Sequence, residues 1–172
     1  MILCFVCFSV SLLATSCLAG PPQPIVEKFI EKCATGDWSG AEMSLSERGK
    51  LLYTKDKTLQ DTFWPMLGLG VASGITPDVI KSKFSQYVIM VSSDSSTDTG
   101  QVRVKINNSI LLGETLAKTI LDQTGLKSID VNVKFDLVQE MGRWKIEKIN
   151  PQLDPIELSK WENFSRKSPP RS

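Results

Sequence analysis

The spacing of apolar residues changes from helical to strand-like about halfway along the chain. In residues 24–34 the apolar side chains fall on one face and the charged ones on the other, which predicts an amphipathic helix. Asp37 is the expected N-cap of a second helix, which carries Trp38. Helical spacing also predicts a helix over residues 59–72 and one short helical turn at residues 76–78. The first half of the domain is therefore expected to be helical.

From residue 84 onward, apolar and polar residues alternate as they do in strands. Residues 84–91 predict a strand that is partly covered on both faces, and a polar loop is expected at residues 92–99. Strands with one apolar and one polar face are predicted at residues 101–106, 129–137 and 144–146. The last of them follows a turn at Gly142. Residues 109–123 have helical spacing, and a last short helix is expected from residue 155. Helices followed by mostly antiparallel strands predict an α+β fold.

The chain opens with a leader that carries no charged side chain before Glu27. Its apolar run, residues 2–14, is shorter than the roughly 20 residues that cross a bilayer. Small residues follow the apolar run, which predicts an export signal at residues 1–19. The prolines after them predict a stiff proline-rich linker at residues 20–24. No Lys or Arg precedes the apolar run, so either the leader is atypical or the true start of the chain lies elsewhere. An uncleaved membrane anchor is the alternative to an export signal.

Two cleavage points fit this leader. Small residues before Gly20 suit a general signal peptidase. The segment from Ala14 to Cys17 resembles the lipobox of bacterial lipoproteins, in which the cysteine is acylated, although Leu is usual where Ala14 stands. The protein is therefore expected outside the cytoplasm, either in the periplasm or extracellular space or held at the membrane by a lipid on Cys17.

Residues 25–164 are expected to form a single domain, followed by a basic, disordered tail at residues 165–172. The 20 basic and 19 acidic side chains nearly balance, so charge gives no case for nucleic acid as a partner. The chain has no histidine, which removes the commonest general base. Cys33 is the one cysteine after the leader and shares the apolar helix face, so we expect a buried thiol, with no disulfide framework and no cysteine-based zinc site. No cofactor and no metal are predicted.

Two patches of the sequence resemble a known superfamily. The helix from Pro24, the corner Gly36-Asp37-Trp38 and the helix after it resemble the opening of the nuclear-transport-factor-like superfamily, also called SnoaL-like or cystatin-like. The segment 140–146, with a glycine turn before Trp-x-Ile, is similar to the final hairpin of that superfamily. The likeness is greatest to small exported and lipoprotein members of unassigned function. It implies N-terminal helices packed on a curved, mostly antiparallel sheet, a cone-like half barrel, in which residues 109–123 resemble an insertion.

Such a cone would leave a tapering apolar cavity between helices and sheet, the usual place for a small ligand. The candidates to line it are aromatic: Trp38, Phe63, Trp64, Tyr87, Phe135 and Trp144. The alternative is that these side chains fill the core, since aromatic residues dominate protein cores.

Three functions are compatible with the sequence. The favoured one is an exported or lipid-anchored, non-enzymatic domain that binds a small apolar ligand or a partner protein of the cell envelope. The second is an enzyme of the SnoaL or ketosteroid-isomerase type with a carboxylate base in the cone. Asp130, Asp136 and Glu140 share a polar strand face, however, and are expected to pair across strands with Arg103 or Lys105, so no catalytic residue is predicted. The third is a pure protein-interaction module, and the oligomeric state stays open.

Overall fold

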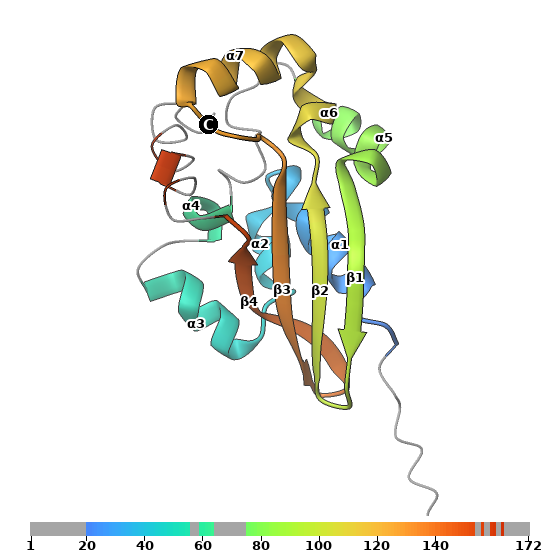
Figure 1. The fold of residues 1–172 in the computed structure, drawn as a ribbon. Helices are drawn as coiled ribbons and strands as arrows, with labels where there is room; N and C mark the ends of the chain where they lie inside the picture. Colours follow the sequence, from blue (N-terminus) through green and yellow to red (C-terminus); the bar gives the residue numbers. More distant parts are fainter. Residues whose placement is uncertain are drawn as a thin grey trace, which may run out of the picture.

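The computed structural model describes residues 20–55, 59–63 and 75–153, together with residues 156, 159, 160 and 163. Among the elements whose bounds the structure describes, five helices come first and are followed by two strands, two helices and two more strands (Figure 1). The bounds are α1 Gln23–Ala34, α2 Trp38–Glu42, α3 Glu47–Lys55, α4 Leu59–Phe63, α5 Pro77–Tyr87, β1 Val88–Ser95, β2 Thr99–Ile106, α6 Asn108–Leu112, α7 Glu114–Thr124, β3 Val131–Glu140 and β4 Arg143–Pro151. The four strands form one antiparallel sheet in the order β1-β2-β3-β4, which is not closed. The predicted α+β class is confirmed.

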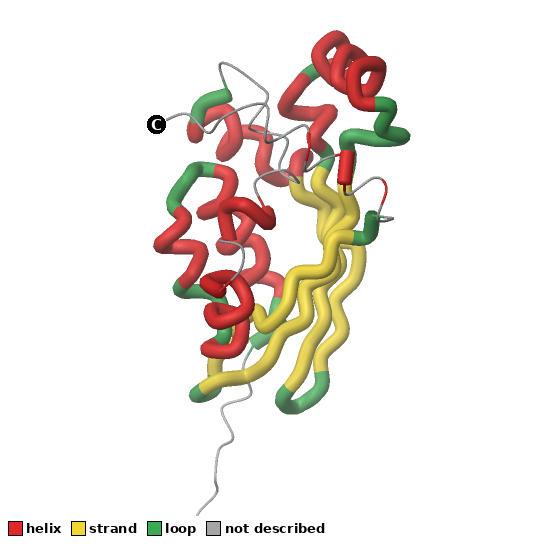
Figure 2. Tube along the Cα trace, turned by 90° about the vertical axis from the view of Figure 1, so that its left-hand side faces the viewer, coloured by secondary structure: helices red, strands yellow, loops and turns green. Residues whose placement is uncertain are grey.

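The helices α1 to α4 cover one face of the sheet, and Figure 2 shows the strands bending around them. The apolar face of α1 supplies fully buried side chains to the core, among them Val26, Phe29 and Ile30. Along β2 and β3 the inward-facing residues are buried and the alternate ones are exposed or half-buried, as the period of two predicts. The other face of the sheet is mostly polar, although Ile89 of β1 is exposed on it.

Several predictions concern residues outside the described part of the chain. These are the leader at residues 1–19, the predicted helix beyond residue 63, most of the helix expected from residue 155, and the tail at residues 165–172. The proline-rich linker is shorter than predicted, because α1 already begins at Gln23 and has Pro24 in its first turn. A proline is tolerated there, since the first amides of a helix have no partner within the helix.

The strand predicted at residues 84–91 is wrong in its first half. Helix α5 runs from Pro77 through Tyr87, so the short turn predicted at residues 76–78 is a helix of 11 residues. Its N-cap is Thr76, whose side chain accepts a hydrogen bond from the amide of Val79 at 3.4 Å. Ile80, Phe84 and Tyr87 lie three and four residues apart, which puts them on one face of a helix, whereas a period of two puts Phe84 and Tyr87 on opposite faces of a strand.

Two other boundaries differ from the prediction. The loop expected at residues 92–99 is short, because β1 continues to Ser95 and β2 begins at Thr99. The helix predicted at residues 109–123 is two helices, which are separated by Gly113 with a φ of 75° and a ψ of 163°. This extended backbone with positive φ is open essentially to glycine alone, so the residue type fixes the break between α6 and α7.

The β3–β4 hairpin closes in a two-residue turn at Met141 and Gly142, with φ of 52° and 73°. The predicted glycine turn is confirmed, and both residues take the left-handed conformation that such tight hairpins require. The outer edge of β4 is covered by the segment that precedes α3. The amide of Ser46 donates to the carbonyl of Ile146 at 2.9 Å, and the amide of Ile146 donates to the carbonyl of Ser44 at 2.9 Å.

Candidate functional site

Three phenylalanines pack against one another in the interior between the helices and the sheet. Phe29, Phe63 and Phe135 are each 0% exposed. Their ring centroids are 5.3 Å apart for Phe29 and Phe63, 5.8 Å for Phe29 and Phe135, and 6.1 Å for Phe63 and Phe135. These distances and the tilted or edge-on angles are those of packed aromatic pairs. The structure thus brings two of the six predicted pocket residues together, and at this place side chains occupy the space between helices and sheet.

The other predicted pocket residues are spread over the domain. Tyr87 is fully buried at the end of α5, while Trp38 is half-buried against the core. Trp144 lies near the hairpin turn, where its ring would be 3.3 Å from a Cβ placed on Gly100. Its indole Nε1 donates to the carbonyl of Gly20 at 2.6 Å. Trp64 lies outside the described residues, as does the lipidation candidate Cys17.

A cleft of about 670 Å³ opens between α1, α2 and the start of β4. Four of the side chains that line it are basic: Lys28, Lys32, Arg143 and Lys145. Asp37 is the acidic residue of the lining. We call this depression the basic cleft. Its charges come from segments more than a hundred residues apart in the sequence, which the hairpin brings beside the N-terminal helices.

The local structure at the corner between α1 and α2 sets the charge balance of the basic cleft. The Nζ of Lys32 donates to Oδ2 of Asp37 at 2.7 Å, and the amide of Gly40 donates to Oδ1 of Asp37 at 2.9 Å. The hydrogen bond from Lys32 lowers the pKa of Asp37, and the amide of Gly40 lowers it further. The same bond raises the pKa of Lys32. Asp37 therefore compensates Lys32 and leaves the other three basic residues as an excess of positive charge.

The basic cleft also has an apolar part. Met43, at the end of α2, is 73% exposed, and Ile25 and Trp144 contribute to the wall. The Nζ of Lys145 donates to the carbonyl of Met43, which holds the lysine beside the methionine without neutralising its charge. Cationic heads beside apolar surface can receive a molecule that is itself anionic at one end and apolar at the other.

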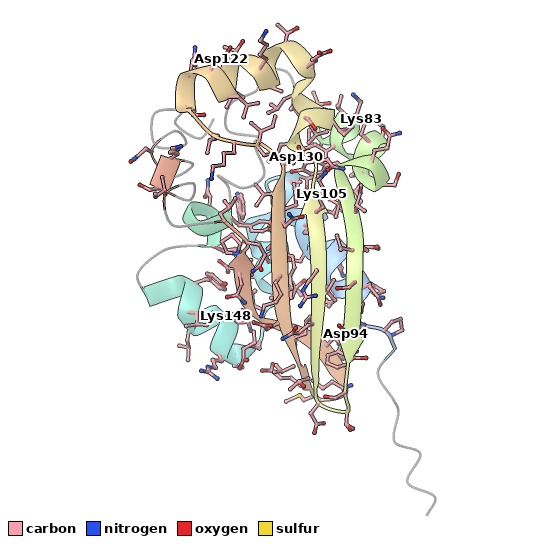
Figure 3. All side chains as sticks on the ribbon, viewed as in Figure 1. Lys83, Asp94, Lys105, Asp122, Asp130 and Lys148 are labelled. Carbon is pink, nitrogen blue, oxygen red and sulfur yellow. The ribbon has the colours of Figure 1, made fainter. Side chains whose placement is uncertain are left out.

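A second depression, of about 600 Å³, lies on the uncovered face of the sheet and has both signs of charge. Lys134 forms an ion pair with Asp136 at 3.4 Å, and Asn150 donates to the same carboxylate at 2.6 Å. The predicted cross-strand pairing is confirmed for Lys105 and Asp130, which are 3.7 Å apart and lie close together in Figure 3. The charged groups of this face compensate one another, so we expect no strong preference for a ligand here.

Other chemistry is limited in the described part of the chain. Cys33 is fully buried, as predicted, and burial raises the pKa of its thiol well above the ordinary value, which makes it unreactive. Nowhere in residues 20–55, 59–63 and 75–153 do three or more His, Cys, Asp or Glu side chains gather closely enough to hold a metal ion. Among the helices that the structure describes, none has both the length and the apolar character needed to cross a membrane.

The sequence did not indicate the basic cleft. Lys28 and Lys32 stand on the polar face of an amphipathic helix, and Arg143 and Lys145 alternate with apolar residues in a strand. Each pattern is that of an ordinary solvated surface. Searches against protein-family models, curated proteins and solved structures found no match for this chain.

Proposed function

We propose that the chain is an exported, non-enzymatic binding domain, and that the basic cleft is its binding surface for an anionic, partly apolar partner. The observation that carries the proposal is the composition of the basic cleft, in which four basic side chains and one acidic side chain surround exposed apolar surface. The uncharged leader supports export, and the resemblance to exported members of the nuclear-transport-factor-like superfamily agrees with a binding role.

The packing of the interior favours a surface site over a ligand inside the cone. Phe29, Phe63 and Phe135 pack against one another in the interior where a small apolar ligand would lie, which supports a surface site. A catalytic role has no comparable support. The pKa values of Asp37 and Glu47 are lowered, which makes these carboxylates weaker bases.

The proposal is tested by titrating the isotope-labelled protein, purified from an exporting host, with octyl phosphate below its micelle concentration. The phosphate should contact the cationic groups and the alkyl chain should lie on the apolar wall. We expect amide shifts that cluster at Lys28, Met43 and Arg143 and that weaken at high salt. The uncharged analogue octyl glucoside is the matched control and should cause far smaller shifts. Shifts confined to Phe135 and its neighbours, or equal shifts with both compounds, would contradict the proposal.

Export is tested separately by intact-mass analysis of the same preparation. A chain that begins at Gly20, or one that begins at an acylated Cys17, is the expected product. A chain that retains all of residues 1–19 after passage through the export machinery would contradict cleavage and favour the uncleaved anchor.

A further inference from the structure

Among the residues that the structure describes, Lys32 is the cation of the basic cleft that forms an ion pair. Lys28 and Arg143 are both exposed, and neither forms an ion pair with another residue that the structure describes. Lys145 donates to a backbone carbonyl, which carries no net charge. Lys32 is compensated by Asp37 at 2.7 Å. Three cationic groups therefore remain available at one end of the molecule.

Two carboxylates near the β3–β4 hairpin are engaged on the side of α3. Glu47 forms an ion pair with Lys50 at 2.7 Å. Glu140, just before the hairpin turn, accepts a hydrogen bond from the amide of Glu47 at 3.2 Å. Lys145 does lower the pKa of Glu47, but this is the weakest of the influences on that group. These acids therefore do not cancel the charge of the basic cleft.

Exposed apolar side chains accompany these cations. Met141 is 102% exposed at the tip of the hairpin that carries Arg143 and Lys145, and Met43 is 73% exposed beside Lys145. Large apolar side chains next to Lys and Arg are typical of surfaces that rest on the headgroups of a bilayer, because the apolar groups enter the interface while the cations stay at the phosphates.

The described chain begins at the same end. The carbonyl of Gly20, its first residue, accepts the hydrogen bond from Trp144, a residue of the basic cleft. Figure 1 shows the described N-terminus toward the end of the sheet where the hairpin turns lie. Cys17 is three residues before Gly20, and three extended residues span about 11 Å at most. This reach is comparable to the roughly 8–10 Å over which charges are felt in physiological salt.

We infer that the basic cleft and the tip of the β3–β4 hairpin form one membrane-facing surface, which rests on anionic lipid headgroups. This inference rests on the proposed function and names its partner as the surface of an anionic bilayer. The leader or a lipid on Cys17 holds the domain near the bilayer, and the cations with Met43 and Met141 set which side faces it. The uncovered polar face of the sheet then stays directed to solvent.

The test is co-sedimentation of the protein, purified from an exporting host, with vesicles of phosphatidylcholine alone or mixed with phosphatidylglycerol. An acyl chain or a retained leader contributes equally to both vesicle types, so the ratio of the two partition coefficients isolates the charged surface. Each cation near an anionic surface strengthens binding roughly fivefold, so three of them should give a ratio on the order of 100 for the wild type. The double variant Lys28→Glu with Arg143→Glu should lower this ratio at least about 25-fold.

The matched control reverses two exposed lysines far from the hairpin turn, Lys81→Glu with Lys118→Glu, which changes the net charge by the same amount. It should retain the wild-type ratio within about threefold, because these charges lie beyond the screening length. Circular dichroism confirms that each variant is folded. A wild-type ratio near one, or an equal fall in both double variants, overturns the inference. If octyl phosphate still binds in the basic cleft when this ratio is near one, the proposed function stands and the membrane surface is excluded.

Discussion

Replacing Phe135 by alanine tests whether the interior of the cone is filled. The side chain is 0% exposed and makes edge-on contacts with Phe29 and Phe63 at interplanar angles of 72° and 67°. Removing a buried aromatic side chain forfeits about 1.5–3 kcal/mol of burial, and each lost ring contact adds about 0.5–1.5 kcal/mol. We therefore expect Phe135→Ala to lower the free energy of unfolding by about 3–5 kcal/mol.

The assay is equilibrium urea denaturation followed by circular dichroism, with and without saturating benzene. Benzene should stabilise Phe135→Ala, which has an apolar cavity, and leave the wild type unchanged. The control is Phe84→Ala, since Phe84 is half-buried, and its loss should be smaller. If Phe135→Ala lowers the free energy of unfolding by less than about 1 kcal/mol, or if benzene stabilises the wild type, the interior is not filled and a ligand pocket is favoured.

Three further substitutions test particular contacts. Met141 has a φ of 52° in the hairpin turn, so Met141→Asn should raise the free energy of unfolding by about 0.5–1 kcal/mol, and a lowered urea midpoint would contradict the turn geometry. A Cβ on Gly49 would lie 2.5 Å from the carbonyl oxygen of Ile146, so Gly49→Ala should lower the free energy of unfolding by about 1–3 kcal/mol. In a helix with free space around it, the same change would raise stability. An unchanged free energy of unfolding would show that α3 does not lie so close to β4. The hydrogen bond from Lys32 lowers the pKa of Asp37 in the folded state. The ionised carboxylate therefore stabilises the fold above its unfolded pKa of about 3.9. This stabilisation is lost as the pH falls through the lower, folded pKa. The urea midpoint of Asp37→Asn should thus change less than that of the wild type between about pH 5 and about pH 2, and an equal change would contradict the pairing.

The elements with long, regular patterns could be predicted from the sequence. The strand at Val131–Glu140 alternates over its whole length, and α1 has a complete apolar face, so both follow from periodicity. Helix α5 was misread as a strand over residues 84–87, because four residues fit a period of two as well as a helical period. A helical start at residues 76–78 follows from the sequence, but nothing in the local pattern shows how far a helix continues once it has begun.

The basic cleft could not be predicted for a different reason. Lys28 and Arg143 are separated by more than a hundred residues, and each stands in a pattern that is ordinary for a surface. They meet because the hairpin turn and the covered edge of β4 place the start of β4 beside α1 and α2. Such proximity depends on the packing of the whole sheet against the helices, which no local pattern contains.

The basic cleft as a binding surface is tested most directly by photo-crosslinking in the host that exports the protein. A benzophenone amino acid replaces Met43, which is 73% exposed in the basic cleft, or Leu52, which is 50% exposed on α3 and serves as the control. The benzophenone at position 43 should form a product with membrane lipid, detected by mass, and the one at position 52 should not. No product at position 43, or the same products from both positions, would contradict the account.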